Sequence, residues 1–156
     1  MIEINNLTAS PVDKKFLEKI AESILKKEKK LNKDLSIALV GFERMRELNK
    51  KYRGKNLATD VLSFQYGDSG EVAICLPQVK KNAKKFKSTT ELPLAETKVK
   101  TRTKFSSPFK KELTRVLIHG ILHLLGFNHE KNEKEADKMR KKEADYLIKS
   151  ICRKLI

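Results

Sequence analysis

The chain has 156 residues, of which 39% are hydrophobic and 35% charged, and it carries a formal net charge of +15 at pH 7. This size favours one domain over residues 1–156 with a continuous core. Neither a signal peptide nor an apolar run long enough for a membrane helix is recognisable, so we expect a cytoplasmic protein that does not contact membranes. The excess of Lys and Arg favours nucleic acid as a partner, because basic side chains that neutralise phosphates release counterions. A basic surface that is merely solvated is the alternative.

Taken in chain order, the first part of the sequence predicts two strands that alternate with two helices. Residues 2–5 alternate in polarity as a strand does. Apolar residues at helical spacing then run from Val12 until about Asn32. A nearly continuous β-branched run at 35–42 predicts a buried strand, and a helix over 43–53 follows it.

The next residues predict a β-hairpin and a third helix. Two apolar strands over 61–66 and 71–76 flank the turn residues 67–70, a pattern typical of a hairpin. Pro77 is suited to the first turn of a helix that continues to about Lys87.

Residues 88–108 form the least regular part of the sequence. They are rich in Thr, Ser, Lys and Pro and show no sustained hydrophobic period. A segment of this length without secondary structure in a compact domain is either functional or mobile, so we interpret it as a long loop or an insertion.

Two further helices follow in the sequence. Residues 109–126, with Ser106 or Ser107 near the start, are apolar on most helical faces and predict the central buried helix. Gly126 suits the left-handed residue that ends such a helix. The last helix starts at about Glu133, and its predicted inward stripe consists of Ala136, Met139, Ala144, Leu147, Ile148 and Ile151.

All three histidines of the chain, His119, His123 and His129, lie within eleven positions. The first two are four residues apart on the predicted buried helix, so they project from one face and can share a metal ion. Gly126 ends the helix, and the chain can turn back so that His129 completes a trigonal set. Three nitrogen donors favour Zn²⁺ over other late first-row ions, which the same ligands also accept, and three protein ligands plus water are typical of a catalytic site.

Two alternatives to an open catalytic site remain at this point. Histidines buried together without a metal would each need hydrogen-bond partners for their ring nitrogens. Glu130 offers an oxygen ligand that would close a purely structural site. Gly120 stands where a zinc protease of the HExxH type carries its glutamate base, so the peptidase mechanism of that class lacks its base at the usual place.

Three segments of the chain together resemble a known family. The stretch "HGILHLLGFNH" resembles the H-G-x-L-H-L-x-G-x-D-H signature of the YbeY family, bacterial endoribonucleases associated with ribosomal RNA maturation. The stretches "LNKKYRGKNLATDVLSF" and "GEVAICLP" are similar to two other motifs of the family and occur in the same order. A long histidine motif together with an independent second motif makes this resemblance specific.

The resemblance implies an α+β fold, in which a small mixed β-sheet packs against about five helices and the metal lies in a cleft beside the central buried helix. It implies that His119, His123 and His129 bind a single Zn²⁺ and that Arg53 faces the metal and holds the RNA phosphate. These four residues are therefore the candidate catalytic residues. The implied partners are ribosomal RNA or ribosomal particles, and a monomer is favoured.

The function implied by the resemblance is a zinc-dependent, single-strand-type endoribonuclease that acts in maturation of the 3′ end of 16S ribosomal RNA and in ribosome quality control. A metal-activated water would attack the phosphodiester, and the planar guanidinium of Arg53 would hold two phosphate oxygens. Alternatively, Arg53 is a surface charge at a helix end. Lys55 is a weaker phosphate candidate, and Thr59, Asp60 and Ser63 lie near the expected cleft loop without a specific role.

Two rival functions stay open. One is a non-catalytic, zinc-stabilised RNA-binding or ribosome-assembly factor. The other is a metal hydrolase of a different substrate, such as a peptide or a small ester. Gly120 speaks against a peptide substrate, and the net charge of +15 favours RNA.

The sequence also departs from the family pattern at three positions. Asn128 stands where the family usually has Asp, Ala58 replaces the usual Pro, and Glu71 replaces the usual Asp. If residue 128 orients a metal ligand, Asn keeps the hydrogen-bond acceptor but loses the charge, a type of change that costs about 10 to 100-fold in metal affinity or activity. Alternatively, Asn128 serves only the turn.

Overall fold

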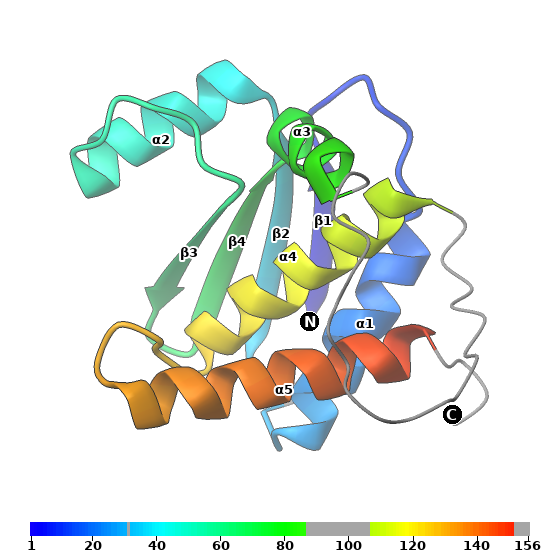
Figure 1. The fold of residues 1–156 in the computed structure, drawn as a ribbon, viewed down its shortest axis with the longest axis vertical. Coiled ribbons are helices and arrows are strands. Elements are labelled where there is room, and N and C mark those ends of the chain that lie inside the picture. Colours follow the sequence, from blue (N-terminus) through cyan, green and yellow to red (C-terminus); the bar gives the residue numbers. More distant parts are fainter. Residues whose placement is uncertain (31, 87–106, 152–156) are drawn as a thin grey trace.

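The computed structural model describes residues 1–30, 32–86 and 107–151. Within these residues, a four-stranded mixed sheet is accompanied by five helices, which confirms the predicted α+β fold (Figure 1). The strands are β1 (Ile2–Asn6), β2 (Asp34–Val40), β3 (Val61–Tyr66) and β4 (Ser69–Cys75). The helices are α1 (Lys14–Lys27), α2 (Phe42–Arg53), α3 (Leu76–Phe86), α4 (Pro108–Leu124) and α5 (Glu133–Ile151).

The strand order in the sheet is β1-β2-β4-β3. β2 pairs in parallel with both β1 and β4, whereas β3 and β4 are antiparallel. The pairing of Tyr66 with Ser69 leaves a two-residue turn, in which Gly67 adopts a φ of 56°. The predicted hairpin is therefore confirmed, although β4 begins at Ser69, inside the predicted turn. β3 lies at one edge of the sheet.

Two predicted boundaries were wrong for local reasons. The strand predicted at 35–42 ends at Val40, and Phe42 begins α2 with its side chain 44% exposed. An apolar side chain thus extended the predicted strand without being buried. The first helix ends at Lys27 rather than near Asn32, because Lys29 adopts a φ of 56°, which a helix does not allow.

The sheet separates two apolar clusters, because successive side chains of a strand point to opposite faces. Leu35, Ile37 and Leu39 of β2 belong to the larger cluster, which includes residues of α1, α4 and α5. Ala38 and Val40 of β2 belong to a smaller cluster, which also contains Met45 of α2. In Figure 1, α4 crosses in front of the strands, α5 runs along it, and α2 stands apart from both.

α4 is the central buried helix, as predicted. It packs against α1, α3 and α5 and against strands β3 and β4. Ser107 caps its start by accepting a hydrogen bond from the backbone N–H of Lys110, and Pro108 occupies the first turn. The rest of the loop predicted at 88–108 lies outside the described residues. Among the described residues, no helix has both the length and the apolar character to cross a membrane.

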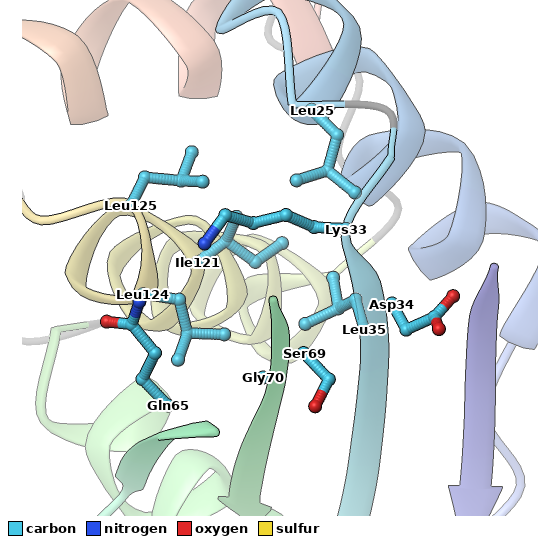
Figure 2. Close-up of a pocket in the computed structure, with 10 residues that line it drawn as sticks. All are labelled: Leu25, Lys33, Asp34, Leu35, Gln65, Ser69, Gly70, Ile121, Leu124 and Leu125. Atoms are coloured by element: carbon cyan, nitrogen blue, oxygen red, sulfur yellow. The ribbon is translucent and has the colours of Figure 1, made fainter. Parts of the chain in front are cut away.

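The end of α4 is packed closely against β4. A Cβ atom at Gly70 would lie 2.8 Å from Leu124 Cδ1, so a larger residue here would require the Leu124 side chain to move. Figure 2 shows the small pocket beside this contact, across which the side chain of Lys33 extends near Ile121 and Leu125. Its volume of about 10 Å³ admits roughly one water molecule, so it is a packing defect and not a ligand site.

The predicted inward stripe of α5 is partly wrong. Met139 is fully buried, and Ala136 and Leu147 are partly buried, as predicted. Ala144 and Ile148, however, are exposed. The side chain of the last predicted member, residue 151, lies outside the described part of the chain.

The face that α5 turns inward is set by polar contacts with α1. Tyr146 is buried, and its hydroxyl donates a hydrogen bond of 2.6 Å to the carboxylate of Glu28, which also binds the Lys142 ammonium at 2.5 Å. Burial of Tyr146 in place of Ile148 brings Glu143 to the side of α5 that faces α4. The orientation of this helix therefore affects the region of the three histidines.

Candidate metal centre

α4 brings two of the three histidines together. The Nε2 atoms of His119 and His123 are 3.1 Å apart, and the centroids of the two rings are 4.6 Å apart. Both side chains are half-buried, while the residues that flank them on the helix are buried in the core. The prediction that residues four apart on a buried helix share one face is therefore confirmed.

A tight turn after α4 adds the third histidine. Gly126 has a φ of 94°, and the backbone N–H of Phe127 donates back to the carbonyl of Leu122 at 3.1 Å. The centroid of the His129 ring lies 5.0 Å from that of His123. One potential ligand atom from each of the three histidines falls within 4.8 Å of the others.

Asn128 contributes to this turn. Its side-chain oxygen accepts a hydrogen bond of 2.8 Å from the backbone N–H of Glu130. This contact supports the interpretation in which Asn128 serves the turn. In the part of the chain that the structure describes, no hydrogen bond links the Asn128 side chain to a histidine.

The spacing of the histidines fits a metal ion, and so does the protonation state of His123. Two nitrogen ligands of a tetrahedral ion with bonds of 2.0–2.1 Å lie about 3.3 Å apart, close to the observed separation of 3.1 Å between His119 and His123. Burial lowers the pKa of His123, and the neighbouring His119 and His129 lower it further. A lowered pKa keeps the imidazole neutral, which is the form that binds metals.

A carboxylate from α5 contacts the first histidine. Nδ1 of His119 is hydrogen-bonded to the carboxylate of Glu143, and both side chains are mostly shielded from solvent, with exposures of 24% and 19%. Sequence reasoning missed Glu143. Its position four residues after the predicted core residue Met139 could have indicated that Glu143 faces inward, because this spacing places two side chains on one face of a helix.

A second ionic group lies one helical turn before His119. The Nε and Nη2 atoms of Arg115 donate to the carboxylate of Glu112, at distances down to 2.6 Å, and Nη2 lies 3.8 Å from Asp60. Glu112 is 6% exposed. The bonds to Glu112 raise the pKa of Arg115, so this buried carboxylate has a permanent counter-charge.

The histidines open into a cleft of about 540 Å³. Residues from the end of α2, from the following loop and from the edge strand β3 also line it. Two cationic residues, Arg53 and Lys55, line it together with the histidines. The remaining lining residues are mainly polar: Asn49, Leu57, Thr59, Asp60, Val61, Leu62, Ser63, Gln65, Leu124, Asn128 and Glu130.

Arg53 is held at this cleft by the end of its helix. It is the last residue of α2, and Gly54 follows with a φ of 68°, which turns the chain out of the helix. The buried Asn49 side chain donates a hydrogen bond of 2.8 Å to the carbonyl of Leu57 and so ties the next loop to α2. Burial and the two neighbouring histidines affect the pKa of His123 more than the charge of Arg53 does, which lowers it further.

Gly120 faces the sheet and not the cleft. A Cβ atom at this position would lie 2.7 Å from Val72 Cγ1, and the Gly120 carbonyl accepts a hydrogen bond of 2.9 Å from the hydroxyl of Ser63. A glutamate here would meet the sheet before it reached the metal centre. Close packing of α4 on the sheet thus explains why this position does not carry the glutamate base of HExxH proteins.

Comparisons with known proteins were made for the whole chain. A family model described as Endoribonuclease YbeY matches residues 3–99 and 94–150. The chain is 38% identical to Endoribonuclease YbeY of a Sulfurihydrogenibium species, over 80% of this chain and 75% of that protein. It is 32% identical to Endoribonuclease YbeY of Petrotoga mobilis, over 95% of this chain and 93% of that protein. The solution structure of a Thermotoga maritima protein, 30% identical, superposes with a TM-score of 0.60 and covers 97% of this chain and 89% of that one.

Proposed function

The chain belongs to the Endoribonuclease YbeY family, and we propose that it is a zinc-dependent endoribonuclease that hydrolyses phosphodiesters of single-stranded RNA. Ribosomal RNA is the proposed substrate, in maturation of the 3′ end of 16S ribosomal RNA and in ribosome quality control, as the resemblance to the family implies. One observation carries the chemical part of this proposal: the three histidines and Arg53 line one and the same cleft.

His119, His123 and His129 are the proposed metal ligands. Zinc held by these three imidazoles would supply a water molecule with its pKa lowered to about 7 and would polarise a phosphoryl oxygen. Burial of His123 keeps its imidazole neutral, and the turn at Gly126 directs His129 toward the two helical histidines. Among the described residues the group that could hold the ion consists of these three nitrogen donors, which is the ligand set of catalytic zinc sites.

Arg53 is the proposed phosphate-binding residue. Negative charge grows on the non-bridging oxygens as a phosphodiester is attacked, and a preoriented cation stabilises that charge. The guanidinium presents a planar fork that can bind two of these oxygens at once. Lys55, beside it in the cleft, adds attraction for the backbone without such geometry.

The size of the cleft supports a single-stranded substrate. A volume of about 540 Å³ is that of a pocket for a small molecule, and so suits one nucleotide unit rather than the width of a duplex. The polar lining by Asn49, Thr59, Ser63 and Gln65 offers hydrogen-bonding groups to an unpaired base or a ribose. The net charge of +15 supplies the general attraction for RNA.

The proposal is tested by incubating zinc-loaded protein with a single-stranded RNA and with the same sequence in a duplex. We expect cleavage of the single strand, loss of cleavage after chelation of the metal, and recovery when zinc is restored. His123→Ala, purified in the same way, should cut neither RNA and so controls for contaminating nucleases. Binding of RNA without turnover by the zinc-loaded wild type would instead identify a non-catalytic RNA-binding factor.

A further inference from the structure

We propose that Glu143 is a positioning residue of the metal centre, which fixes the ring of His119 and determines which of its nitrogens faces the metal. The observation behind this proposal is the hydrogen bond between His119 Nδ1 and the Glu143 carboxylate. It rests on the metal-binding part of the proposed function, but not on the choice of RNA as the substrate.

The hydrogen bond selects one tautomer of His119. A neutral imidazole carries one N–H, and a carboxylate only accepts hydrogen bonds, so the contact with Glu143 places that hydrogen on Nδ1. Nε2 then holds the lone pair, and Nε2 is the atom that lies 3.1 Å from Nε2 of His123. In the other tautomer, the N–H of His119 would point toward His123 and the lone pair of Nδ1 would face a negative charge.

α5 holds Glu143 firmly in this position. Met139, one turn earlier, is fully buried, and Tyr146, almost one turn later, is buried and bonded to Glu28. Lys142, the immediate neighbour of Glu143, binds the same Glu28 carboxylate. These contacts fix the rotation of α5, so the Glu143 side chain is directed at His119 of α4.

The neighbouring cation Arg115 is bonded to other carboxylates. Arg115 lies close enough for the charge of Glu143 to contribute to its raised pKa, after the larger effects of Glu112 and Asp60. Two donor nitrogens of Arg115 are, however, bonded to Glu112, and Nη2 also lies 3.8 Å from Asp60. The Glu143 carboxylate is thus left to His119.

The three histidines differ in whether a carboxylate is bonded to them. Among the residues that the structure describes, His119 is the one histidine bonded to a carboxylate. A carboxylate behind a ligating imidazole increases the basicity of the ligand and fixes the ring plane, and loss of such a partner typically lowers metal affinity by about 10 to 100-fold.

The inference is tested by comparing the full-length wild type with Glu143→Ala, Glu143→Gln and Glu133→Gln. Glu133 is an exposed residue of the same helix, and Glu133→Gln removes the same charge as Glu143→Gln. Glu133→Gln is therefore the matched control. Zinc affinity is measured by competition with a chromophoric chelator. The tautomer of His119 in the metal-free protein is read from its ¹⁵N chemical shifts.

We expect the metal-free wild type to carry the His119 hydrogen on Nδ1. Glu143→Ala should lose this preference and bind zinc about 10 to 100-fold more weakly. Glu143→Gln keeps a hydrogen-bond acceptor without the charge, so it should retain the tautomer and lose less affinity. Glu133→Gln should match the wild type in both measurements.

Two results would overturn the inference: a His119 hydrogen on Nε2 in the wild type, or wild-type zinc affinity in both Glu143 variants. If Glu143→Ala fails to fold, the nearly isosteric Glu143→Gln decides the question through its affinity. A wild type that binds zinc but cleaves no RNA would contradict the proposed function alone. A wild type that binds no zinc would overturn the metal assignment, and the positioning role with it.

Discussion

The two sides of the cleft are built differently. The histidine side is part of α4, which packs against three helices and two strands. It lies so close to the sheet that a Cβ atom at Gly120 would be 2.7 Å from Val72 Cγ1. The arginine side is the exposed end of α2, a helix with only two buried residues, Met45 and Asn49. One side is held by the core of the protein, and the other by a short helix and a turn.

This difference matches what each side has to do. A metal ion requires ligand distances within about 0.2 Å, so its ligands belong on the most constrained element. A phosphate-binding arginine has a long side chain and acts through charge as well as contact. It can therefore function on a backbone segment that is held less rigidly. Changes on the arginine side should therefore affect the binding and cleavage of RNA, whereas changes on the histidine side should affect metal binding and stability as well.

Of the variants that distinguish the two sides of the cleft, Arg53→Ala is expected to have the largest effect, a loss of RNA cleavage. Removal of the guanidinium should lower kcat/KM for single-stranded RNA by about 10² to 10³-fold, because charge in the transition state loses its counter-ion. The slope of log affinity for RNA against log salt should fall by about 1. Zinc affinity and the free energy of unfolding should remain those of the wild type.

Arg46→Ala is the matched control for Arg53→Ala. Arg46 is an exposed arginine of the same helix and does not line the cleft. Its removal should leave kcat/KM nearly unchanged. An Arg53→Ala variant that cleaves RNA as fast as this control would remove Arg53 from the mechanism.

On the histidine side, Gly120→Ala should destabilise the protein. The added Cβ atom would lie 2.7 Å from Val72 Cγ1, so α4 has to move away from the sheet. We expect a loss of about 1–3 kcal/mol in the free energy of unfolding, measured by urea denaturation of the metal-free protein, and weaker zinc binding. Gly41→Ala, where a Cβ atom meets nothing within 4 Å, should lose less stability and keep its zinc affinity.

A smaller, pH-dependent effect is expected for Glu28→Gln, which loosens α5 behind the histidine side. Burial raises the pKa of Glu28, but its bonds with Lys142 and Tyr146 outweigh that effect and hold the pKa below its usual value. The folded-state pKa lies below the unfolded value, so Glu28 stabilises the protein above about pH 4.5 and this stabilisation is lost as the pH falls through the folded-state pKa.

The variant should lose roughly 1–2 kcal/mol at pH 7 and show a weaker decline of stability in acid. Urea denaturation at a series of pH values measures both quantities. Glu22→Gln, an exposed position on α1 with the same change of charge, is the control. Equal acid sensitivity of Glu28→Gln and the wild type would show that Glu28 does not hold α5.

The sequence predicted much of both sides of the cleft, because their signals are local. The spacing of His119 and His123 on an apolar helix and the stop at Gly126 predicted the trigonal arrangement that the structure shows. The resemblance to a family added Arg53 to the same cleft. These features depend on helix periodicity and turn chemistry within a few residues of one another.

The contacts behind the histidines were not predictable in this way. α5 is rich in Glu and Lys, and local sequence does not distinguish Glu143 from the other acidic residues of the helix. Its contact depends on the rotation of α5, which is set by the buried Tyr146 and by Glu28, more than a hundred residues away in the chain. The predicted burial of Ile148 was wrong for the same reason.

The most direct test of the account is a zinc titration of the metal-free protein in which bound zinc and cleavage of a single-stranded RNA are followed in the same samples. In the wild type, cleavage should rise in proportion to bound zinc and stop rising at a single equivalent per chain. Arg53→Ala should bind zinc as the wild type does but cleave little, and His123→Ala should do neither. Cleavage that is present without zinc, or that persists in His123→Ala, would contradict the account.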